Sequence, residues 1–393
     1  MMASHMSPAI VDVLVVGGGP AGLYAAERLA RHGVSVLVCE EHCEIGRPVH
    51  CTGVLASESF HDFDLPGRSR LNALKTARFV SPAGLTVDYT APSPLAIVID
   101  RVEFDHMLAA RATAAGAELR IGARVSSLEP GPADIRATVG DTRVHARLVV
   151  LACGASYGFQ RRFGLGLPQS YLHTAQRELP ARHLGDVELH FGRAVAPDGF
   201  AWVVPIVRPG GTFARIGAMA SDDALGCYSR MVARVADRWG VTRDETPPRQ
   251  KVLPLGEISR TYADRLLVVG DAAGLVKPTT GGGIHYSILS GGLAADVAVD
   301  ALRRDRLDAA TLSRYERTWR VQLADELSAQ HALRRVVTQL SDAEVDGLFD
   351  LARTDGIMPL VRKTAQFNQH RHLIRALFKH PPARRILFRS LVG

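Results

Sequence analysis

The chain is predicted to adopt an α/β fold, α+β overall, in which a strand–helix–strand unit, an inserted antiparallel β-sheet and a helical C-terminal region share one chain. Residues 11–40 contain two buried strand-like runs on either side of a glycine turn and a helix-period segment. Residues 186–218 alternate between apolar and polar, with Pro-Gly turns, and the helical period returns from about residue 308. At 393 residues the chain suits two domains or one interrupted domain.

Composition excludes several functional classes. The net charge of +7 is modest, and most arginines are interspersed with acids, so nucleic-acid binding is not indicated. No apolar run reaches the roughly 18 residues that a membrane-spanning helix needs. The five cysteines are odd in number and form no C-x-x-C pair, which argues against a disulfide framework and a metal site. We expect a cytoplasmic enzyme.

The N-terminal unit carries a nucleotide-binding motif. The run "VDVLVVGGGPAGLYAAERLARHGVSVLVCE" contains G-x-G-x-x-G as Gly17, Gly19 and Gly22, and Ala21 lies inside it. Glycines permit a tight turn and close approach to a pyrophosphate, while the helix N-terminus favours negative charge. Glu40 ends the second strand, where an acid accepts from a ribose hydroxyl. The unit is therefore predicted to be a Rossmann-type dinucleotide site, and it does not recur.

A distant second segment indicates which dinucleotide is bound. In "RLLVVGDAAGLVKPTTGGGIHYSILS" a buried strand ends in an aspartate, and a glycine cluster leads into a helix of small residues. The aspartate can accept from a ribityl or ribose hydroxyl, and the bare helix amides suit an electron-rich ring edge. This second segment suits an extended ligand and favours FAD. The cofactor-binding residues expected here are Asp271, Gly282, Gly283 and Ile284.

These motifs resemble a known flavoprotein group. "GGGPAG", "GD" followed by P-x-x-G-G-G-I, and "IDRVEFDHMLAARATAAGAEL" are together similar to flavoproteins with the para-hydroxybenzoate hydroxylase fold. That resemblance implies an FAD contact for Arg101. "RPVHCTGVL" resembles the P-x-x-C element of the geranylgeranyl reductase family through Pro48 and Cys51, and "GFAWVVP" resembles its Y-x-W-x-F-P element through Trp202 and Pro205. The similarity covers about residues 10–300.

The chain departs from that family at three positions. Phe200 stands where the family often has tyrosine, and Val204 where it has phenylalanine. Cys153 replaces the aspartate of an A-D-G-x-x-S segment. We therefore expect a substrate wall of altered shape and polarity, formed by Phe200, Trp202 and Pro205; for Trp202, core packing is an equal alternative.

The resemblance implies an FAD-dependent reductase that saturates C=C bonds of an isoprenoid, lipid or related apolar metabolite. Cys51 is the expected catalytic residue, since a thiol with a pKa near 8.5 keeps its proton at neutral pH and can donate it; a small buried hydrophobe is the alternative. Arg47 is expected to face phosphate or ribose, and Arg47 and His50 are potential cations beside the thiol. Thr52 and Val125 complete the cofactor set.

Two other functional classes remain open. One is an FAD-dependent monooxygenase (hydroxylase or epoxidase) or halogenase on the same fold, and the other is a non-catalytic flavin or lipid binder. The chain lacks a W-x-W-x-I-P halogenase element, and the P-x-x-C loop favours reduction. The electron donor is either NAD(P)H, docking transiently, or a ferredoxin.

The predicted organisation interleaves these parts. A hairpin is expected across Ser81–Gly84 and a helix near Ser221. His285, on the first turn of the helix after the glycine cluster, could reach the flavin or face solvent, and the solvent-facing position is preferred. The predicted boundaries are 10–70, 95–155 and 262–305 for a discontinuous FAD-binding domain, 71–94 and 156–261 for a substrate-binding β-sheet domain, and 306–393 for the helical C-terminal region.

The C-terminal stretch is strongly basic. Residues 351–393 hold nine Arg or Lys and one Asp, and apolar residues alternate with the basic ones. Such a stretch can lie on an anionic membrane surface, which suits a lipid-linked substrate. The preferred interpretation is a terminal helix packed on the body with a solvated basic face.

Overall fold

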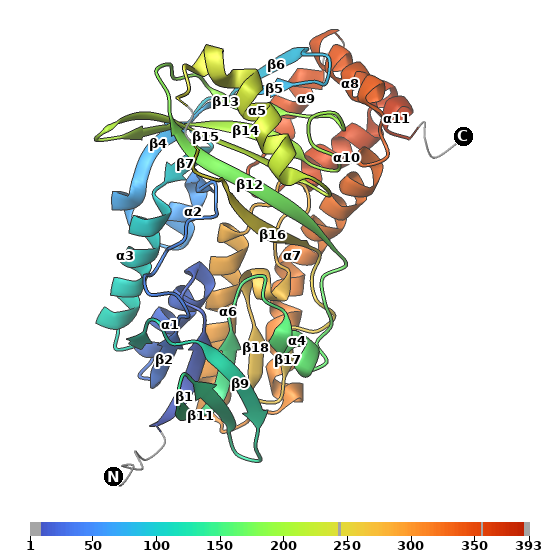
Figure 1. Cartoon of the computed structure of the whole chain (residues 1–393). Helices are drawn as coiled ribbons and strands as arrows, with labels where there is room; N and C mark the ends of the chain where they lie inside the picture. Colours follow the sequence, from blue (N-terminus) through green and yellow to red (C-terminus); the bar gives the residue numbers. More distant parts are fainter. Residues whose placement is uncertain (1–8, 243–244, 355–356, 389–393) are drawn as a thin grey trace.

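The computed structural model of the chain describes residues 9–242, 245–354 and 357–388. Two sheets lie one above the other, and a long helix, α7 (Ala309–Val337), runs beside both of them (Figure 1). The N-terminal end of the described chain lies at the foot of the lower sheet, and the C-terminal helices gather beside the upper one (Figure 1). The expected α/β class is confirmed.

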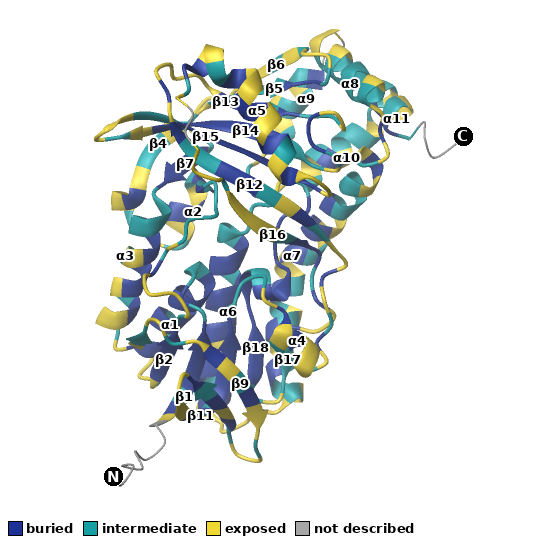
Figure 2. Ribbon diagram, in the orientation of Figure 1, coloured by how far each residue is buried: buried dark blue, intermediate teal, exposed yellow. Residues whose placement is uncertain are grey.

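The lower sheet is the Rossmann-type layer. Its main path runs β17-β18-β11-β1-β2-β8, and β1 pairs in parallel with both β2 and β11. The strands are β1 (Ala9–Val16), β2 (Val36–Cys39), β8 (Glu118–Arg120), β9 (Val125–Pro130), β10 (Ile135–Val139), β11 (Thr142–Leu151), β17 (Tyr262–Ala263) and β18 (Leu266–Val268). Helices α1 (Pro20–Arg31), α3 (Arg101–Ala114) and α6 (Ile284–Arg303) pack with it. Burial is concentrated in β1, β11, β18 and α6 (Figure 2).

The upper sheet is mainly antiparallel, in the order β16-β12-β15-β14-β13-β5-β6, and β13 and β5 form a parallel pair. Its strands are β5 (Thr76–Val80), β6 (Thr86–Thr90), β12 (Ser170–Pro180), β13 (Val187–His190), β14 (Phe200–Arg208), β15 (Gly211–Ala220) and β16 (Arg249–Leu255). The β5–β6 hairpin turns across Ser81–Gly84, as predicted. The division of these layers into domains remains a prediction.

The two faces of the upper sheet have different partners because side chains alternate along each strand. One face, with Ala201, Val203 and Ile216, packs under α5 (Ala224–Trp239). This helix begins after Asp223, whose carboxylate accepts from the Gly226 amide, and not at Ser221. The opposite face forms a second apolar cluster, which turns towards the lower layer: Trp202, Val204, Ile206, Met219 and Leu255.

Short elements join the two layers. A small sheet in the order β3-β7-β4 and helix α2 lie between them. Their bounds, with those of the remaining short helices, are β3 (Val54–Ala56), β4 (Arg70–Leu74), β7 (Ala96–Ile99), α2 (Ser57–Asp62), η1 (Gly67–Ser69), α4 (Gly158–Arg162) and η2 (Gly270–Ala273).

The C-terminal region is helical, as expected. Asp308 caps α7 by accepting from the Thr311 amide at 2.9 Å. The following helices are α8 (Asp342–Thr354), α9 (Ile357–Thr364), α10 (Arg371–Lys379) and α11 (Pro381–Leu387), and they share a small apolar cluster with the end of α7. The last part of the predicted region, 389–393, lies outside the described residues.

Candidate functional site

The glycine turn between β1 and α1 is closely packed except at one position. A Cβ at Gly22 would collide with the carbonyl oxygen of Gly17, and a Cβ at Gly17 would collide with that of Ala152. Around a Cβ at Gly19 there is open space to 4 Å, and no side chain caps the start of α1. The turn therefore presents helix amides to an open space, which fits a dinucleotide pyrophosphate.

Glu40 is tied to this turn. Its Oε2 accepts from the Gly18 amide at 2.7 Å, and its Oε1 accepts from the His42 amide at 3.0 Å. Val125, buried at the start of β9, lies close by, because the Ala123 amide donates to the Glu40 carbonyl at 2.7 Å. Oε1 also contacts His42 Nδ1 at 2.5 Å, whereas Oε2 keeps a second lone pair, so the expected hydrogen bond to a ribose hydroxyl remains open to Oε2 of Glu40.

The second cofactor segment lies beside the first. The carbonyl oxygen of Ala21 lies against Gly291 so closely that a Cβ there would collide with it. Gly291 is seven residues beyond Ile284, the first residue of α6, so about 10 Å separates the start of α1 from the start of α6. No side chain caps α6 at Gly283. Two uncapped helix starts at this separation suit an extended dinucleotide.

Asp271 faces the start of α6. A Cβ built at Gly283 would lie 2.8 Å from its Oδ1. Its main chain is fixed, because Tyr157 Oη donates to the Asp271 carbonyl at 2.8 Å. Within the described residues no hydrogen bond to its carboxylate is found, so the carboxylate is available to a ribityl or ribose hydroxyl.

Cys51 lies in the loop that leads to β3 and is half-buried. Its Sγ accepts from the Gly53 amide at 3.3 Å and lies beside the Arg101 side chain. Arg101 also binds Asp105 at 2.7 Å. Burial opposes the charge on Arg101, but Asp105 and Cys51 outweigh it and hold the pKa of this guanidinium above its ordinary value. The thiol therefore has a permanent cation beside it.

The other expected cations behave differently. Arg47 is exposed, and its Nε binds Glu44 Oε1 at 2.9 Å. Burial, followed by the charges of Lys251 and Arg249, lowers the pKa of His50 to about 4. The expectation that His50 supplies positive charge near Cys51 is therefore wrong near neutral pH.

The expected substrate wall is only partly assembled. Phe200 and Trp202 lie on the inner face of β14 with ring centroids 5.8 Å apart, edge to face. Trp202 is 7% exposed, and its buried Nε1 has no hydrogen-bond partner within the described chain. The expectation for Pro205 is not met: three positions from Trp202, its side chain falls on the α5 face, while its carbonyl accepts from Asn72 at 3.1 Å.

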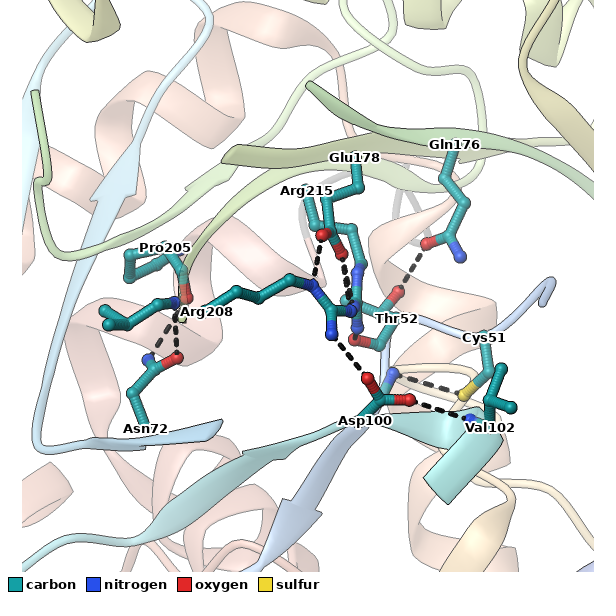
Figure 3. A network of polar contacts seen from close by, with 12 residues as sticks. Cys51, Thr52, Asn72, Asp100, Val102, Gln176, Glu178, Pro205, Arg208 and Arg215 are labelled. Atoms are coloured by element: carbon teal, nitrogen blue, oxygen red, sulfur yellow. Dashed lines mark hydrogen bonds and ion pairs between the residues drawn. The ribbon is translucent and has the colours of Figure 1, made fainter. Parts of the chain in front are cut away.

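The upper sheet contacts two loops of the site, the one that carries the glycine cluster and the one that carries Cys51. A Cβ at Gly281 would lie 2.6 Å from Leu253 and 3.4 Å from the sulfur of Met219, on the same sheet face as Trp202. The Thr52 hydroxyl donates to Gln176 Oε1 of β12 at 3.0 Å (Figure 3). Thr52 was expected to bind cofactor, but its hydroxyl is hydrogen-bonded to the upper sheet. The aromatic wall, the Cys51 loop and the glycine cluster meet under one sheet face.

A polar cavity of about 460 Å³ opens beside the Cys51 loop, between the upper sheet and the start of α3. Arginines outnumber carboxylates around it, which suits anionic groups more than an alkene. The charged residues lining it are Arg47, Arg101, Arg177, Arg208, Arg215, Arg249, Asp100, Glu103 and Glu178.

Sequence reasoning missed a contact between the C-terminal region and the loop that carries the glycine cluster. Lys277 Nζ donates to the Phe367 carbonyl at 2.8 Å and to Asn368 Oδ1 at 2.6 Å. His285 Nδ1 is hydrogen-bonded to Ser59 at 2.8 Å, and Asn368 Nδ2 lies 3.1 Å from it. The expected solvent-facing His285 is therefore wrong, because the segment after α9 covers it. The local pattern around residue 285 carries no signal of this contact.

Burial changes the ionisation of this cluster. It lowers the pKa of Lys277 to about 7 and that of His285 to about 4. The cost of ionising these groups in the folded chain is the cause.

The fold and the site together define an FAD-dependent oxidoreductase of the Rossmann type. A profile of the pyridine nucleotide-disulphide oxidoreductases matches residues 11–181. Digeranylgeranylglycerophospholipid reductase from Methanocaldococcus jannaschii is 32% identical over 356 residues, 86% of this chain and 90% of that protein. The chain belongs to the family of these reductases.

Solved structures share the fold. A geranylgeranyl bacteriochlorophyll reductase-like protein from Thermoplasma acidophilum superposes with a TM-score of 0.84 at 23% identity, covering 98% of this chain and all of that one. A variant of the halogenase PltM in complex with FAD gives a TM-score of 0.65 at 16% identity, covering 98% of this chain and 92% of that one. At these identities the likeness concerns the fold.

Gly19→Ala should weaken FAD binding without unfolding the protein. Gly19 has φ −85°, which alanine adopts freely, and its Cβ would enter only the open space of the cradle. We expect the dissociation constant of FAD to rise at least about tenfold, because a methyl group would obstruct the close approach of the pyrophosphate. The ratio of flavin to protein absorbance after gel filtration measures this. Unchanged FAD retention would place the pyrophosphate elsewhere.

His285→Asn should flatten the acid side of the stability profile. The folded pKa of His285 of about 4 lies below the ordinary histidine value of 6.5, so the folded chain binds fewer protons than the unfolded chain between these values. The contribution of this group to the free energy of unfolding is fully present above pH 6.5. It is lost as the pH falls towards 4, by up to about 3 kcal/mol. Denaturant unfolding at several pH values measures the slope, with the exposed His372→Asn as control. Identical slopes in both variants would contradict the burial of His285.

Proposed function

We propose that this protein saturates C=C bonds in an isoprenoid chain of a lipid or related apolar metabolite. The observation that carries the proposal is the position of Cys51: beside the Arg101 guanidinium, under the sheet face that carries Phe200 and Trp202. Its relatives' names support the substrate class, since they are digeranylgeranylglycerophospholipid reductases.

Bound FAD, once reduced, supplies a hydride to one alkene carbon. The Cys51 thiol donates its proton to the other carbon, so that the C=C bond becomes a C–C single bond and sulfur is left as thiolate. Arg101 stabilises the negative charge on that sulfur, because a buried guanidinium within hydrogen-bond reach favours the anion. A proton from the solvent then restores the Cys51 thiol.

The inner sheet face provides the walls for an apolar chain. Phe200, Trp202, Met219 and Leu253 belong to one apolar cluster, which excludes water from the space beside the glycine cluster. Trp202 Nε1 is buried in this face and has no hydrogen-bond partner among the described residues.

Of the two electron donors, the arginine-rich cavity supports NAD(P)H. The guanidinium groups lining it can bind the phosphates of a nicotinamide dinucleotide, and it adjoins the loop that carries Cys51. A ferredoxin would instead require an exposed docking face. Stopped-flow flavin bleaching with NADPH and with reduced ferredoxin distinguishes the two.

Cys51→Ala should retain FAD and lose alkene reduction. We expect turnover to fall about 100-fold or more, the usual loss when a positioned proton donor is removed. The measurement is anaerobic: the flavin is reduced, a polyprenyl substrate is added, and reoxidation is followed at the flavin absorbance maximum. Cys43→Ala, at an exposed cysteine, is the matched control.

Two outcomes would oppose the proposal. Undiminished turnover in Cys51→Ala would remove this thiol from proton transfer. Reoxidation of the wild-type protein only by oxygen, with hydroxylation or halogenation of an added aromatic compound, would favour the monooxygenase or halogenase alternative. Reoxidation by the alkene without oxygen is the result we expect.

We further propose that the C-terminal helices bring the protein to anionic membranes. Among the described residues of 357–388 there are seven Arg or Lys and no acid, and most of the basic residues are exposed. No helix of the described chain is long and apolar enough to cross a membrane. Contact would therefore be peripheral, through charge and shallow apolar burial.

Vesicle sedimentation tests this contact. The protein should pellet with phosphatidylglycerol vesicles at low salt and stay in solution with phosphatidylcholine vesicles, since each basic residue contributes about 1 kcal/mol only at an anionic surface. Arg384→Glu/Arg385→Glu, at two exposed positions of α11, should abolish most of the binding. Equal binding of this double variant would refute a role for α11.

A further inference from the structure

The peptide that follows Cys51 is held from the opposite sheet. Arg215 of β15 donates from Nη1 to the carbonyl oxygen of Thr52 (Figure 3). Arg215 is only 4% exposed, so this contact is largely shielded from water. The Thr52 side chain is held in addition by Gln176, from the neighbouring strand β12. A loop without regular structure is thus fixed at both its main chain and its side chain.

Glu178 anchors Arg215 in turn. The two residues face each other across β12 and β15, and Arg215 Nη2 lies 2.7 Å from Glu178 Oε2. Burial by itself would raise the pKa of Glu178, but hydrogen bonds from Arg208 and Arg215 outweigh it and hold that pKa below its ordinary value. Glu178 therefore stays ionised and directs the guanidinium group towards Thr52.

A second arm of the same network reaches the other neighbour of the thiol. Arg208 binds Glu178 Oε1 at 2.6 Å and also pairs with Asp100 (Figure 3). Asp100 caps α3 by accepting from the Val102 amide at 3.0 Å. The first residue of that helix is Arg101, which lies beside Cys51. Both arms thus end next to one sulfur atom.

The loop has little room to move away from this arrangement. Gly53 has φ +69°, and a Cβ there would lie 2.8 Å from both Arg215 Nη1 and the Ile99 carbonyl oxygen. The Ile99 amide donates to the Gly53 carbonyl at 2.8 Å. The chain therefore passes between β7 and the Arg215 side chain, and loss of that side chain would open space on one side of the loop.

We propose that Arg215 is a positioning residue for the Cys51 thiol. It fixes the Thr52 peptide so that the thiol stays beside Arg101 and is presented to the reacting carbon. The inference rests on the proposed function of Cys51 for its effect on turnover, but its geometric part concerns only the loop. A fork of five donors can serve Glu178 and Thr52 at once, whereas an ammonium group has no fixed fork.

Arg215→Met, which keeps length and apolar contact but removes every donor, tests the role. We expect turnover of a polyprenyl substrate to fall at least about tenfold with little change in KM, because a misplaced donor slows the step and not the binding. In the FAD-loaded protein, the rate of Cys51 alkylation by iodoacetamide at one fixed pH, followed by peptide mass spectrometry, should rise, because release of the loop makes the half-buried thiol more accessible. Arg215→Lys should restore part of both.

The matched control is Arg78→Met. Arg78 forms an arginine–carboxylate pair with Asp88 in the same sheet, at 2.8 Å, between β5 and β6. Its loss should change neither the alkylation profile nor turnover. If Arg215→Met does not fold, Glu178→Gln removes the anchoring charge instead and should change the alkylation rate in the same direction.

Two failures are distinguishable. If a folded Arg215→Met or Glu178→Gln variant keeps the wild-type alkylation rate, Arg215 is structural only and the inference is overturned. If alkylation shifts while Cys51→Ala turns over at the wild-type rate, the geometry stands and the proposed proton donor fails.

Discussion

The close approach of α1 and α6 sets the geometry on which the rest depends. The two helices touch at Ala21 and Gly291, and at Gly291 no side chain larger than hydrogen fits. This contact fixes the distance between the dinucleotide turn at one helix start and the glycine cluster at the other. The upper sheet contacts the glycine cluster through Met219 and Leu253. The contact between α1 and α6 therefore also determines where the inner face of the upper sheet lies.

The polar network above the Cys51 loop has a different role from the apolar core. Buried ion pairs add little net stability, because desolvation offsets most of their attraction, but they are intolerant of displacement. Glu178, Arg208 and Arg215 satisfy one another and two outside partners, Thr52 and Asp100. The network therefore defines one position of an irregular loop, which apolar packing alone would leave less defined.

Local patterns in the sequence predict the supporting elements well. The strand–turn–helix unit at Gly17, the hairpin at Ser81 and the long helix after Gly283 each follow from residues next to one another in the chain. The contacts that complete the site join residues far apart, such as Thr52 with Gln176, and no local period contains them. His285 was misjudged for the same reason, since the segment that covers it follows more than eighty residues later.

The placement of Pro205 had a usable signal. Trp202 and Pro205 are three residues apart on one strand, so strict alternation already assigns them to opposite faces. No such signal exists for the half-buried charge of Glu178 on β12. Alternation predicts which residues share a face, but it does not predict which of them form ion pairs. The Arg215–Glu178 pair depends on strand register, which the separate strands do not reveal.

The contact between Lys277 and the segment around Asn368 has a consequence for biosynthesis. While the ribosome is still making residues before 368, the loop that carries the glycine cluster lacks the groups that receive the Lys277 ammonium. A nascent chain can form the Rossmann-type layer early, but this loop is completed only after a segment that follows it by more than eighty residues has been made. Folding of the loop is thereby deferred relative to the layer that supports it.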